Sequence, residues 1–280
     1  MKLIIVKFTS PFKIAERENY IDAITLYRAF IKALSLLGES FDEIKNGEVK
    51  FSSMFPIVDN KLYLKMPFKT IQCDNRDMEK ELKKIEYIDV DILKEVEPPY
   101  RLECRGTEKY VKGINGKEIK LESNYLSSYG ETIVEYKNRM DRLVNSADIY
   151  SSPSFMPKYE MGFLSTNWND KLDKALRLLE KLGIGKDRNL GYGKFTVKKI
   201  KDYNLSFPEK RQYKYVTGRA YTEHEFLAER LDKVQILGGD ISLVLFNTLI
   251  LLPIGSLVKN VKRLLLEKEN NIVIIDSILL

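Results

Sequence analysis

The segment that decides how this chain folds is Gly183-Ile184-Gly185-Lys186-Asp187-Arg188-Asn189-Leu190-Gly191-Tyr192-Gly193-Lys194-Phe195. Two Gly-x-Gly pairs enclose five residues, which include Lys186 and Arg188, and Lys194 follows directly. Glycine adopts positive φ angles and has no Cβ to hold a ligand away from the backbone. Successive N–H groups can therefore turn toward a phosphate, and the cationic side chains add positive charge. The segment predicts a loop that binds a phosphate backbone.

The order of elements around this loop excludes two familiar kinds of nucleotide site. Asn169 or Asp170 is expected to cap a helix with apolar residues at steps of three and four, and a strand resumes at Phe195-Thr-Val197. The dinucleotide fingerprint and the P-loop both run from strand to glycines to helix. Here the helix comes first, so a ligand would meet its negative C-terminal end. A helix cap with a glycine turn is the alternative, but it needs only one or two of the four glycines.

Outward from the loop, the apolar pattern predicts an α+β fold. Residues 2–9 are typical of a strand, and Asp22 precedes a helical pattern that ends at Gly38. A hairpin-like pair of short strands flanks the turn Asp59-Asn60. After a long insertion, the helix and strand around the glycine loop complete the order strand, helix, strand, strand, helix, strand. That order is typical of the ferredoxin-like fold, which RNA-recognition domains share.

Two domains are expected. Residues 1–205 should form the ferredoxin-like (RRM-like) domain, with an inserted region at about 70–165. Residues 206–280 should form a smaller β-rich domain, and the sequence leaves open whether it is a second ferredoxin-like domain.

The C-terminal part also contains a predicted helix near Glu223 to Leu231. The longest apolar region, Ile241 to Val258, is interrupted by Asn247, Thr248 and Pro253. Because a bilayer helix needs about 20 largely apolar residues, this region predicts two buried strands and no membrane span.

Composition narrows the class of protein further. With 44% hydrophobic residues the 280-residue chain can bury a large core, which excludes pervasive disorder. The net charge of +6 favours an anionic partner. Two cysteines, Cys73 and Cys104, are too few for a disulfide scaffold or a thiolate zinc site, so we expect reduced thiols in a cytoplasmic protein. The start, Met1 to Lys7, is too short and too charged to predict a signal peptide.

Little in the sequence indicates catalysis. His224 is the single histidine, so at most one imidazole is available for acid–base chemistry. No carboxylate spacing indicates a metal site, and no cofactor is expected.

The glycine segment resembles the signature of the RAMP superfamily of CRISPR proteins, in which paired Gly-hydrophobic-Gly motifs flank five residues with at least one Lys or Arg. Other segments are similar to one family within it, subunit four of the type III-A (Csm) effector. They are Ile21 to Leu26, Ser52-Ser53-Met-Phe-Pro56, Leu62 to Pro67, Arg139-Met-Asp141-Arg142 and Leu251 to Ser256. Lys65 stands where that family's pattern has proline.

The resemblance implies a non-catalytic RNA-binding subunit. Such a subunit holds the single-stranded 5′ repeat-derived tag of the guide RNA (crRNA) and joins the large polymerase–cyclase subunit to the backbone subunits. The residues expected to contact RNA are Gly183, Gly185, Lys186, Arg188, Gly191, Tyr192, Gly193, Lys194, Arg139, Arg142, Ser52 and Ser53.

Alternatives accompany this interpretation. The chain could be a guide-processing endoribonuclease of the same superfamily, with His224 as its acid or base, or an RNA-binding protein outside CRISPR systems. The resemblance also implies that backbone RAMP subunits cut target RNA with a loop aspartate, and Asp22 or Asp59 could have that role. The arginines could form a solvated surface, and the two serines could cap a turn. Phe55 and Tyr192 could belong to the core or stack on bases, whereas Trp168 is expected to pack.

Overall fold

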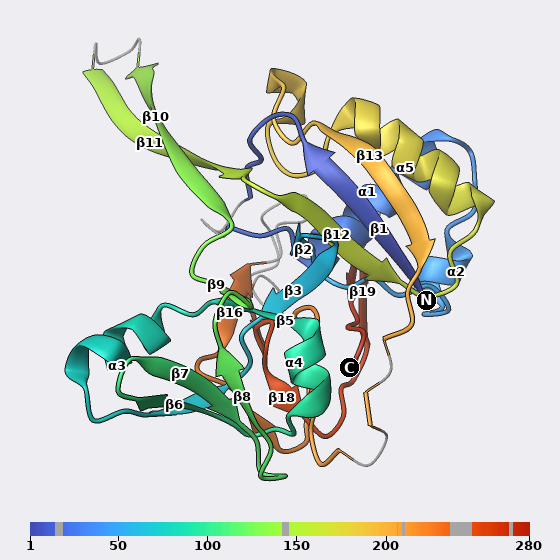
Figure 1. Ribbon diagram of the computed structural model, residues 1–280. Coiled ribbons are helices and arrows are strands. Elements are labelled where there is room, and N and C mark those ends of the chain that lie inside the picture. Colours follow the sequence, from blue (N-terminus) through green and yellow to red (C-terminus); the bar gives the residue numbers. More distant parts are fainter. Residues whose placement is uncertain (15–18, 142–145, 206, 209–210, 236–247, 269–270) are drawn as a thin grey trace.

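A seven-stranded antiparallel sheet forms the centre of the computed structural model (Figure 1). The structure describes residues 1–14, 19–141, 146–205, 207–208, 211–235, 248–268 and 271–280. The order of strands in the sheet is β13-β1-β12-β2-β3-β5-β9. Their bounds are β1 Lys2–Phe8, β2 Phe55–Val58, β3 Lys61–Lys65, β5 Tyr87–Asp89, β9 Tyr125–Leu126, β12 Glu160–Ser165 and β13 Phe195–Asp202.

Two helices pack against each other beside this sheet: α1 (Ala23–Leu36) and α5 (Asp170–Leu182). Asp22 caps α1 by accepting the Thr25 N–H at 2.7 Å, and Asn169 caps α5 by accepting the Leu172 N–H at 3.1 Å. Each cap satisfies an N–H group that the first helical turn leaves unpaired. The predicted strand at 2–9 and both predicted helices are therefore confirmed. Trp168 packs as expected, with its ring edge-on to Phe30 at 5.8 Å between centroids.

The predicted hairpin is also confirmed, but its second strand, β3, does not lie beside β1, where the third strand of a ferredoxin-like order would lie. Asp59 and Asn60 both have positive φ and connect β2 to β3. The strand that lies between β1 and β2 is β12, which follows the insertion, so β3 lies farther out in the sheet. Gly162 makes this close packing possible, because a Cβ there would lie 2.9 Å from Ile57 and 3.0 Å from Leu3.

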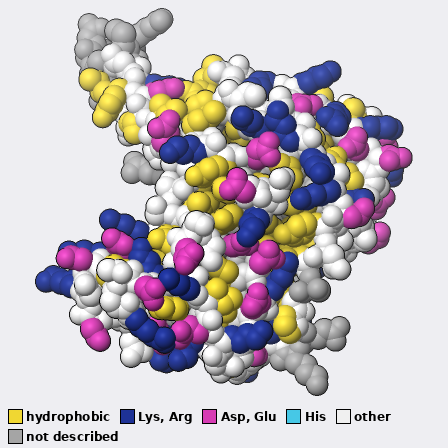
Figure 2. Space-filling model, viewed as in Figure 1, with side chains coloured by type: hydrophobic (Ala, Val, Ile, Leu, Met, Phe, Trp, Pro, Cys, Tyr) yellow, Lys and Arg dark blue, Asp and Glu magenta, His cyan; other side chains and the backbone are white. Residues whose placement is uncertain are grey.

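The region between β3 and β12 contains a second sheet of order β4-β6-β7-β8, two helices and a projecting hairpin (Figure 1). The elements are β4 Lys69–Gln72, α3 Arg76–Lys83, α4 Val90–Glu95, β6 Tyr100–Arg105, β7 Glu108–Lys112, β8 Glu118–Leu121, β10 Gly130–Asp141 and β11 Ser146–Pro157. The hairpin β10–β11 extends away from the body, and Figure 2 shows hydrophobic side chains along it.

The cysteine prediction is wrong. Cys73 and Cys104 form a disulfide, with their Cα atoms 5.0 Å apart. The strands β4 and β6 pair in parallel with Gln72 opposite Glu103, so the next pair along this register is the two cysteines. Strand pairing therefore brings together thiols that are 31 residues apart in the sequence.

The C-terminal part consists of short strands. They are β14 Lys214–Tyr215, β15 Phe226–Leu227, β16 Asp232–Gln235, β17 Thr248–Leu251, β18 Leu257–Val258, β19 Leu264–Lys268 and β20 Asn271–Ile275. The β19–β20 hairpin packs on α1. A four-residue helix, α2 (Asp42–Lys45), and the 3₁₀ turn η1 (Arg188–Leu190) complete the described elements.

The helix predicted near Glu223 to Leu231 is wrong, because this segment contains β15 instead. Glu223 and Glu225 pair with Lys262 and Lys259, and β15 pairs with β18, so contacts with a distant segment outweigh local helix propensity.

The apolar region after Ile241 is described only in part. Residues 241–247 lie outside the described residues. The remainder contains the two short strands β17 and β18, joined by residues 252–256; β18 is buried, whereas Ile250 of β17 is 56% exposed. Within the described part of the chain, none of the helices has the length and hydropathy needed to cross a membrane.

Candidate nucleic-acid interface

The glycine loop leaves the C-terminus of α5 and enters β13. Gly183 ends the helix with φ +82°, and its N–H donates to the Leu179 carbonyl at 2.7 Å. Lys194 completes this end of the helix, because its ammonium donates to the Lys181 carbonyl. Lysine at a helix C-terminus is stabilised by the negative end of the dipole. The structure thus gives Lys194 a helix-capping contact where the sequence predicted contact with RNA.

The base of the loop is packed backbone against backbone. The Ile184 N–H donates to the Gly193 carbonyl at 2.9 Å, and the Gly193 N–H donates to the Pro11 carbonyl at 2.8 Å. A Cβ on Gly193 would lie 1.9 Å from the Ile184 carbonyl oxygen, and one on Gly185 would lie 2.5 Å from the Lys13 carbonyl oxygen. Three of the four glycines, Gly183 included, are therefore required by the approach of the protein's own backbone. The prediction that all four allow a ligand to approach is corrected to this extent.

The tip of the loop differs from its base. Gly191 has φ +93° and open space around its Cβ position, and Lys186, Asn189 and Leu190 are exposed. Arg188 is half-buried in η1. Neither Lys186 nor Arg188 forms a salt bridge or a side-chain hydrogen bond with another described residue, so none of the described carboxylates neutralises either charge. A packed base that carries two such cations at its tip can bind an anionic chain.

Tyr192 links the loop to two other segments. Its hydroxyl donates to the Glu135 carboxylate near the middle of strand β10, and the Lys13 ammonium lies 3.8 Å from the centroid of its ring. The hydrogen bond from Tyr192, together with Lys13, lowers the pKa of Glu135 below its usual range. Burial works to lower the pKa of Lys13, but its contacts with Tyr192 and Glu135 outweigh burial and raise it.

Of the two arginines predicted to contact RNA, one lies in the described part of the hairpin. Arg139 belongs to β10, where it pairs with Asp148 of β11. Arg142 lies outside the described residues. Between Arg139 and the base of the hairpin, Lys137 pairs with Tyr150, which is 49% exposed.

The structure corrects the prediction that Ser52 and Ser53 contact RNA. Ser52 and Ser53 are fully buried. The Ser52 hydroxyl donates to the Ser53 carbonyl at 2.7 Å and accepts the Leu164 N–H at 2.8 Å, while the Ser53 hydroxyl accepts the Ala23 N–H at 3.1 Å. Both hydroxyls hold β12 and the start of α1 in place, so neither is accessible to phosphate.

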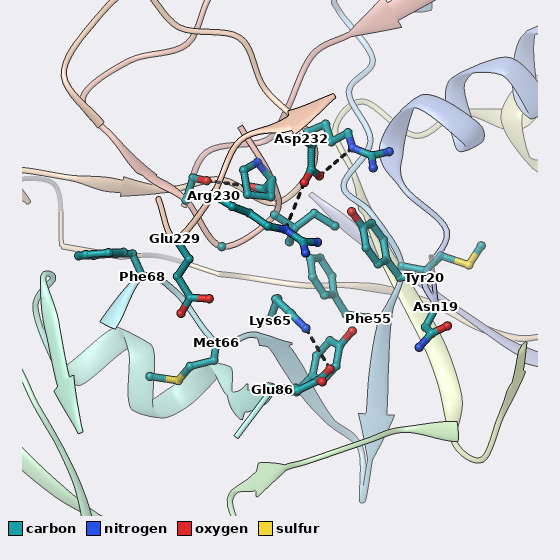
Figure 3. Close-up of a pocket in the computed structure, with 17 residues that line it drawn as sticks. Asn19, Tyr20, Phe55, Lys65, Met66, Phe68, Glu86, Glu229, Arg230 and Asp232 are labelled. Carbon is teal, nitrogen blue, oxygen red and sulfur yellow. Dashed lines mark hydrogen bonds and ion pairs between the residues drawn. The ribbon is translucent and has the colours of Figure 1, made fainter. Parts of the chain in front are cut away.

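A cavity of about 640 Å³ lies between the β2–β3 hairpin, the insertion and the C-terminal part (Figure 3). Its wall is partly aromatic, with Tyr20, Phe55, Phe68 and Tyr87. Lys65 and Arg230 point into it from different elements, and each pairs with a carboxylate, Lys65 with Glu86 at 3.0 Å and Arg230 with Asp232 at 3.4 Å. Gly255 and Ser256, from the last of the segments that resemble the Csm family, also line it.

The catalytic alternatives find little support in the geometry. His224 is exposed in the turn before β15. Asp22 is buried, and its second carboxylate oxygen accepts from Arg219 at 2.7 Å. Asp59 occupies an exposed turn. The described residues contain no cluster of His, Cys, Asp and Glu that could hold a metal ion.

Sequence reasoning missed Lys13 and Glu135. Lys13 is 4% exposed and contacts residues from both the glycine loop and the hairpin. No local pattern marks a lysine that follows a strand and a Ser-Pro turn, and Glu135 lies 122 residues farther along the chain.

Comparison with solved structures finds this fold over the whole chain. A chain in the crystal structure of the Csm3–Csm4 subcomplex of the type III-A CRISPR–Cas interference complex matches with a TM-score of 0.61 and 18% identity, covering 100% of this chain and 98% of that chain. A chain of the Csm1–Csm4 cassette in complex with cA4 matches with a TM-score of 0.62 and 18% identity, covering 99% and 95%. A chain of the type III-B Cmr-beta complex, bound to cognate target RNA and AMPPnP, matches with a TM-score of 0.52 and 11% identity, covering 92% and 86%. No protein-family model and no curated protein matches the sequence.

These likenesses define the class by its fold, which is that of subunits in type III CRISPR complexes. Within this class the fold is Csm4-like, because the matches that cover almost the full length of both chains come from Csm3–Csm4 and Csm1–Csm4 assemblies.

Proposed function

We propose that the chain is a non-catalytic RNA-binding subunit of a type III-A CRISPR effector, which holds the 5′ repeat-derived tag of crRNA. The observation that carries the proposal is the glycine loop, whose packed base supports Lys186 and Arg188 at the tip, where neither cation pairs with a described residue. Phosphate contacts of this kind position a nucleic acid without reading its sequence. The Csm4-like fold over the whole chain supports the assignment to this subunit.

The strand order supports a ferredoxin-like core within residues 1–205. The order β13-β1-β12-β2, with all neighbours antiparallel, places the fourth, first, third and second strands side by side. In this proposal the insertion lies between β2 and β12, and β3, β5 and β9 extend the sheet. In this proposal the short strands after residue 206 form a second, β-rich unit.

The cavity supplies the base-specific part of the proposed RNA site. Single-stranded RNA is held by stacking of unpaired bases on aromatic side chains and by hydrogen bonds to base edges. Tyr20 and Phe68 are half-buried and offer ring surfaces, and Lys65 and Arg230 offer donors in the same wall. Phe55 is 1% exposed, so it belongs to the core and is not available for stacking. We assign the cavity to one unpaired base of the tag.

The partners in this proposal are a backbone RAMP subunit and the large polymerase–cyclase subunit, between which the chain forms a bridge. Support comes from the similar chains, which were solved together with Csm3 and with Csm1. The proposal needs no cofactor and no metal, and it places the complex in the cytoplasm.

Binding of labelled RNA tests the proposal. Guide RNA with the repeat-derived tag should bind more tightly than RNA of the same length with a scrambled tag, and it should remain uncut. Equal affinity for the two RNAs would argue for a general RNA-binding protein. Metal-independent cleavage at one site, abolished by His224→Ala, would establish the endoribonuclease instead.

A further inference from the structure

We propose that Lys13, Glu135 and Tyr192 form a latch that positions hairpin β10–β11 against the glycine loop, so that the two flank one RNA-binding groove. The inference rests on the proposed RNA-binding function and concerns residues whose role is positioning. The latch is this set of three side chains, together with the Ser152 hydroxyl that accepts from Lys13 at 2.9 Å.

The latch joins three segments that are distant in sequence. The Lys13 ammonium lies 3.3 Å from Glu135 of β10 and 3.8 Å from Asp187 of the glycine loop. The Lys13 carbonyl also accepts the Lys186 N–H at 2.8 Å. One residue therefore holds the loop through its backbone and the hairpin through its side chain. Lys13 is 4% exposed, so its ammonium depends on these partners. A buried charge without a partner would strongly destabilise the folded state.

Strand alternation shows which face of the hairpin the latch turns toward the loop. Residues that pair across antiparallel strands share a face, and that face repeats every second residue. Glu135 pairs with Ser152, and the next pair on the same face is Lys137 with Tyr150. Since Glu135 and Ser152 both contact Lys13, the side chains of Lys137 and Tyr150 continue outward from the latch on the loop side.

The two faces of the hairpin differ in chemistry. The face that continues from the latch offers a cation and an aromatic ring, the combination that binds single-stranded RNA. The opposite face presents Val134, Tyr136 and Ile149, which are 47%, 77% and 75% exposed, and none of its described side chains is cationic. RNA is therefore expected on the face shared with Lys186 and Arg188. Glu135 is a carboxylate at neutral pH, as its contact with the Lys13 ammonium requires, and the hydrogen bond from Tyr192 lowers its pKa further.

Because Glu135 is negatively charged, its substitution distinguishes the latch from simple electrostatics by the direction in which RNA affinity changes. Glu135→Gln removes a negative charge beside an RNA site, so simple electrostatics predicts tighter binding. The latch predicts weaker binding, by about threefold to tenfold, because the hairpin is no longer held in place. Glu131→Gln is the matched control. Glu131 is exposed on the same face of the same strand, so this substitution removes the same charge without touching the latch. Affinities for tag-bearing RNA are compared by fluorescence anisotropy.

A double-mutant cycle separates positioning from direct contact. Lys137→Gln should weaken RNA binding in the wild-type protein by several-fold and by clearly less in the Glu135→Gln background, because the two sites act together. Tyr192→Phe retains the ring over Lys13 and removes only the hydroxyl, with its contacts to Glu135 and Lys13, so its affinity should lie between wild type and Glu135→Gln. It provides a variant with minimal disturbance of folding.

Each result has a definite meaning. Weaker binding by Glu135→Gln and a reduced effect of Lys137→Gln in that background establish the latch. If wild type binds tag RNA and Glu135→Gln binds as tightly as Glu131→Gln, with the full effect of Lys137→Gln, the latch is rejected and the proposed function stands. If wild type does not bind tag RNA, the proposed function fails and the latch fails with it.

Discussion

The glycine loop and the serine pair are both parts of family-like motifs, yet the structure uses them in different ways. In the loop, a packed base supports a tip with two cations that have no ion-pair partner in the described part of the chain. In the serine pair, Ser52 and Ser53 are fully buried, and their hydroxyls bind backbone groups of the protein. A motif can therefore be typical of a family for two reasons, contact with the ligand or construction of the site. Burial and hydrogen-bond partners distinguish the two.

The largest expected effect divides the loop itself into base and tip. Gly193→Ala should lower the free energy of unfolding by roughly 3–5 kcal/mol, because the new Cβ would meet a backbone oxygen at a positive φ. Gly191→Ala has the same φ problem in open space and should cost only about 1–2 kcal/mol. Urea unfolding of both variants measures the difference. Equal costs would mean that base and tip are not distinct.

The serine pair should matter for folding and not for RNA. Ser52→Ala leaves the buried Leu164 N–H without its partner, and Ser53→Ala does the same to the Ala23 N–H, so each should lower the free energy of unfolding by about 1–3 kcal/mol. Affinity for tag RNA, measured well below the unfolding temperature, should stay at the wild-type level. A stable Ser52→Ala protein with weakened RNA binding would contradict the assignment of these hydroxyls.

A smaller expected effect is the pH dependence of stability, which should differ between the contacts of the glycine loop and those of the serine pair. Glu135 has a lowered pKa in the folded state, mainly through the hydrogen bond from Tyr192 and then Lys13. A lowered pKa of a carboxyl group contributes stability that is complete above the unfolded pKa of about 4.3 and is lost as pH falls through the folded value. The difference in melting temperature between wild type and Glu135→Gln should therefore be constant above about pH 5 and shrink below about pH 4.

The melting temperature of the serine variants, measured over the same pH range, provides the comparison. The hydroxyl bonds of Ser52 and Ser53 carry no charge, so the destabilisation of Ser52→Ala should not change over the same pH range. If the loss of melting temperature in Ser52→Ala changed with pH as the loss in Glu135→Gln does, the glycine loop and the serine pair would not be independent.

Periodic elements and turns could be predicted from the sequence. The apolar spacing located β1, α1 and α5, and Asp59-Asn60 located the β2–β3 turn. Strand β12 could not be placed between β1 and β2, because about a hundred residues separate it from β2 and local patterns do not encode pairing partners.

The composition of the site was less predictable than its location. The glycine loop was located by its spacing, but that spacing does not reveal that Gly185 and Gly193 pack against the chain itself. The contact between Lys13 and Glu135 spans 122 residues, and the Cys73–Cys104 disulfide depends on the register of two parallel strands. In each case the deciding fact is a long-range contact, which a single sequence does not display.

The salt dependence of RNA binding by the variant Lys186→Glu/Arg188→Glu tests whether the loop tip binds phosphates. If the loop tip binds phosphates, affinity at low salt should fall by about tenfold to a hundredfold, and the slope of log affinity against log salt should flatten by about 1–2. Lys84→Glu/Lys117→Glu, which makes the same charge change at exposed sites of the insertion, is the control and should change the slope little. A loop variant that kept the wild-type affinity and slope would contradict the account.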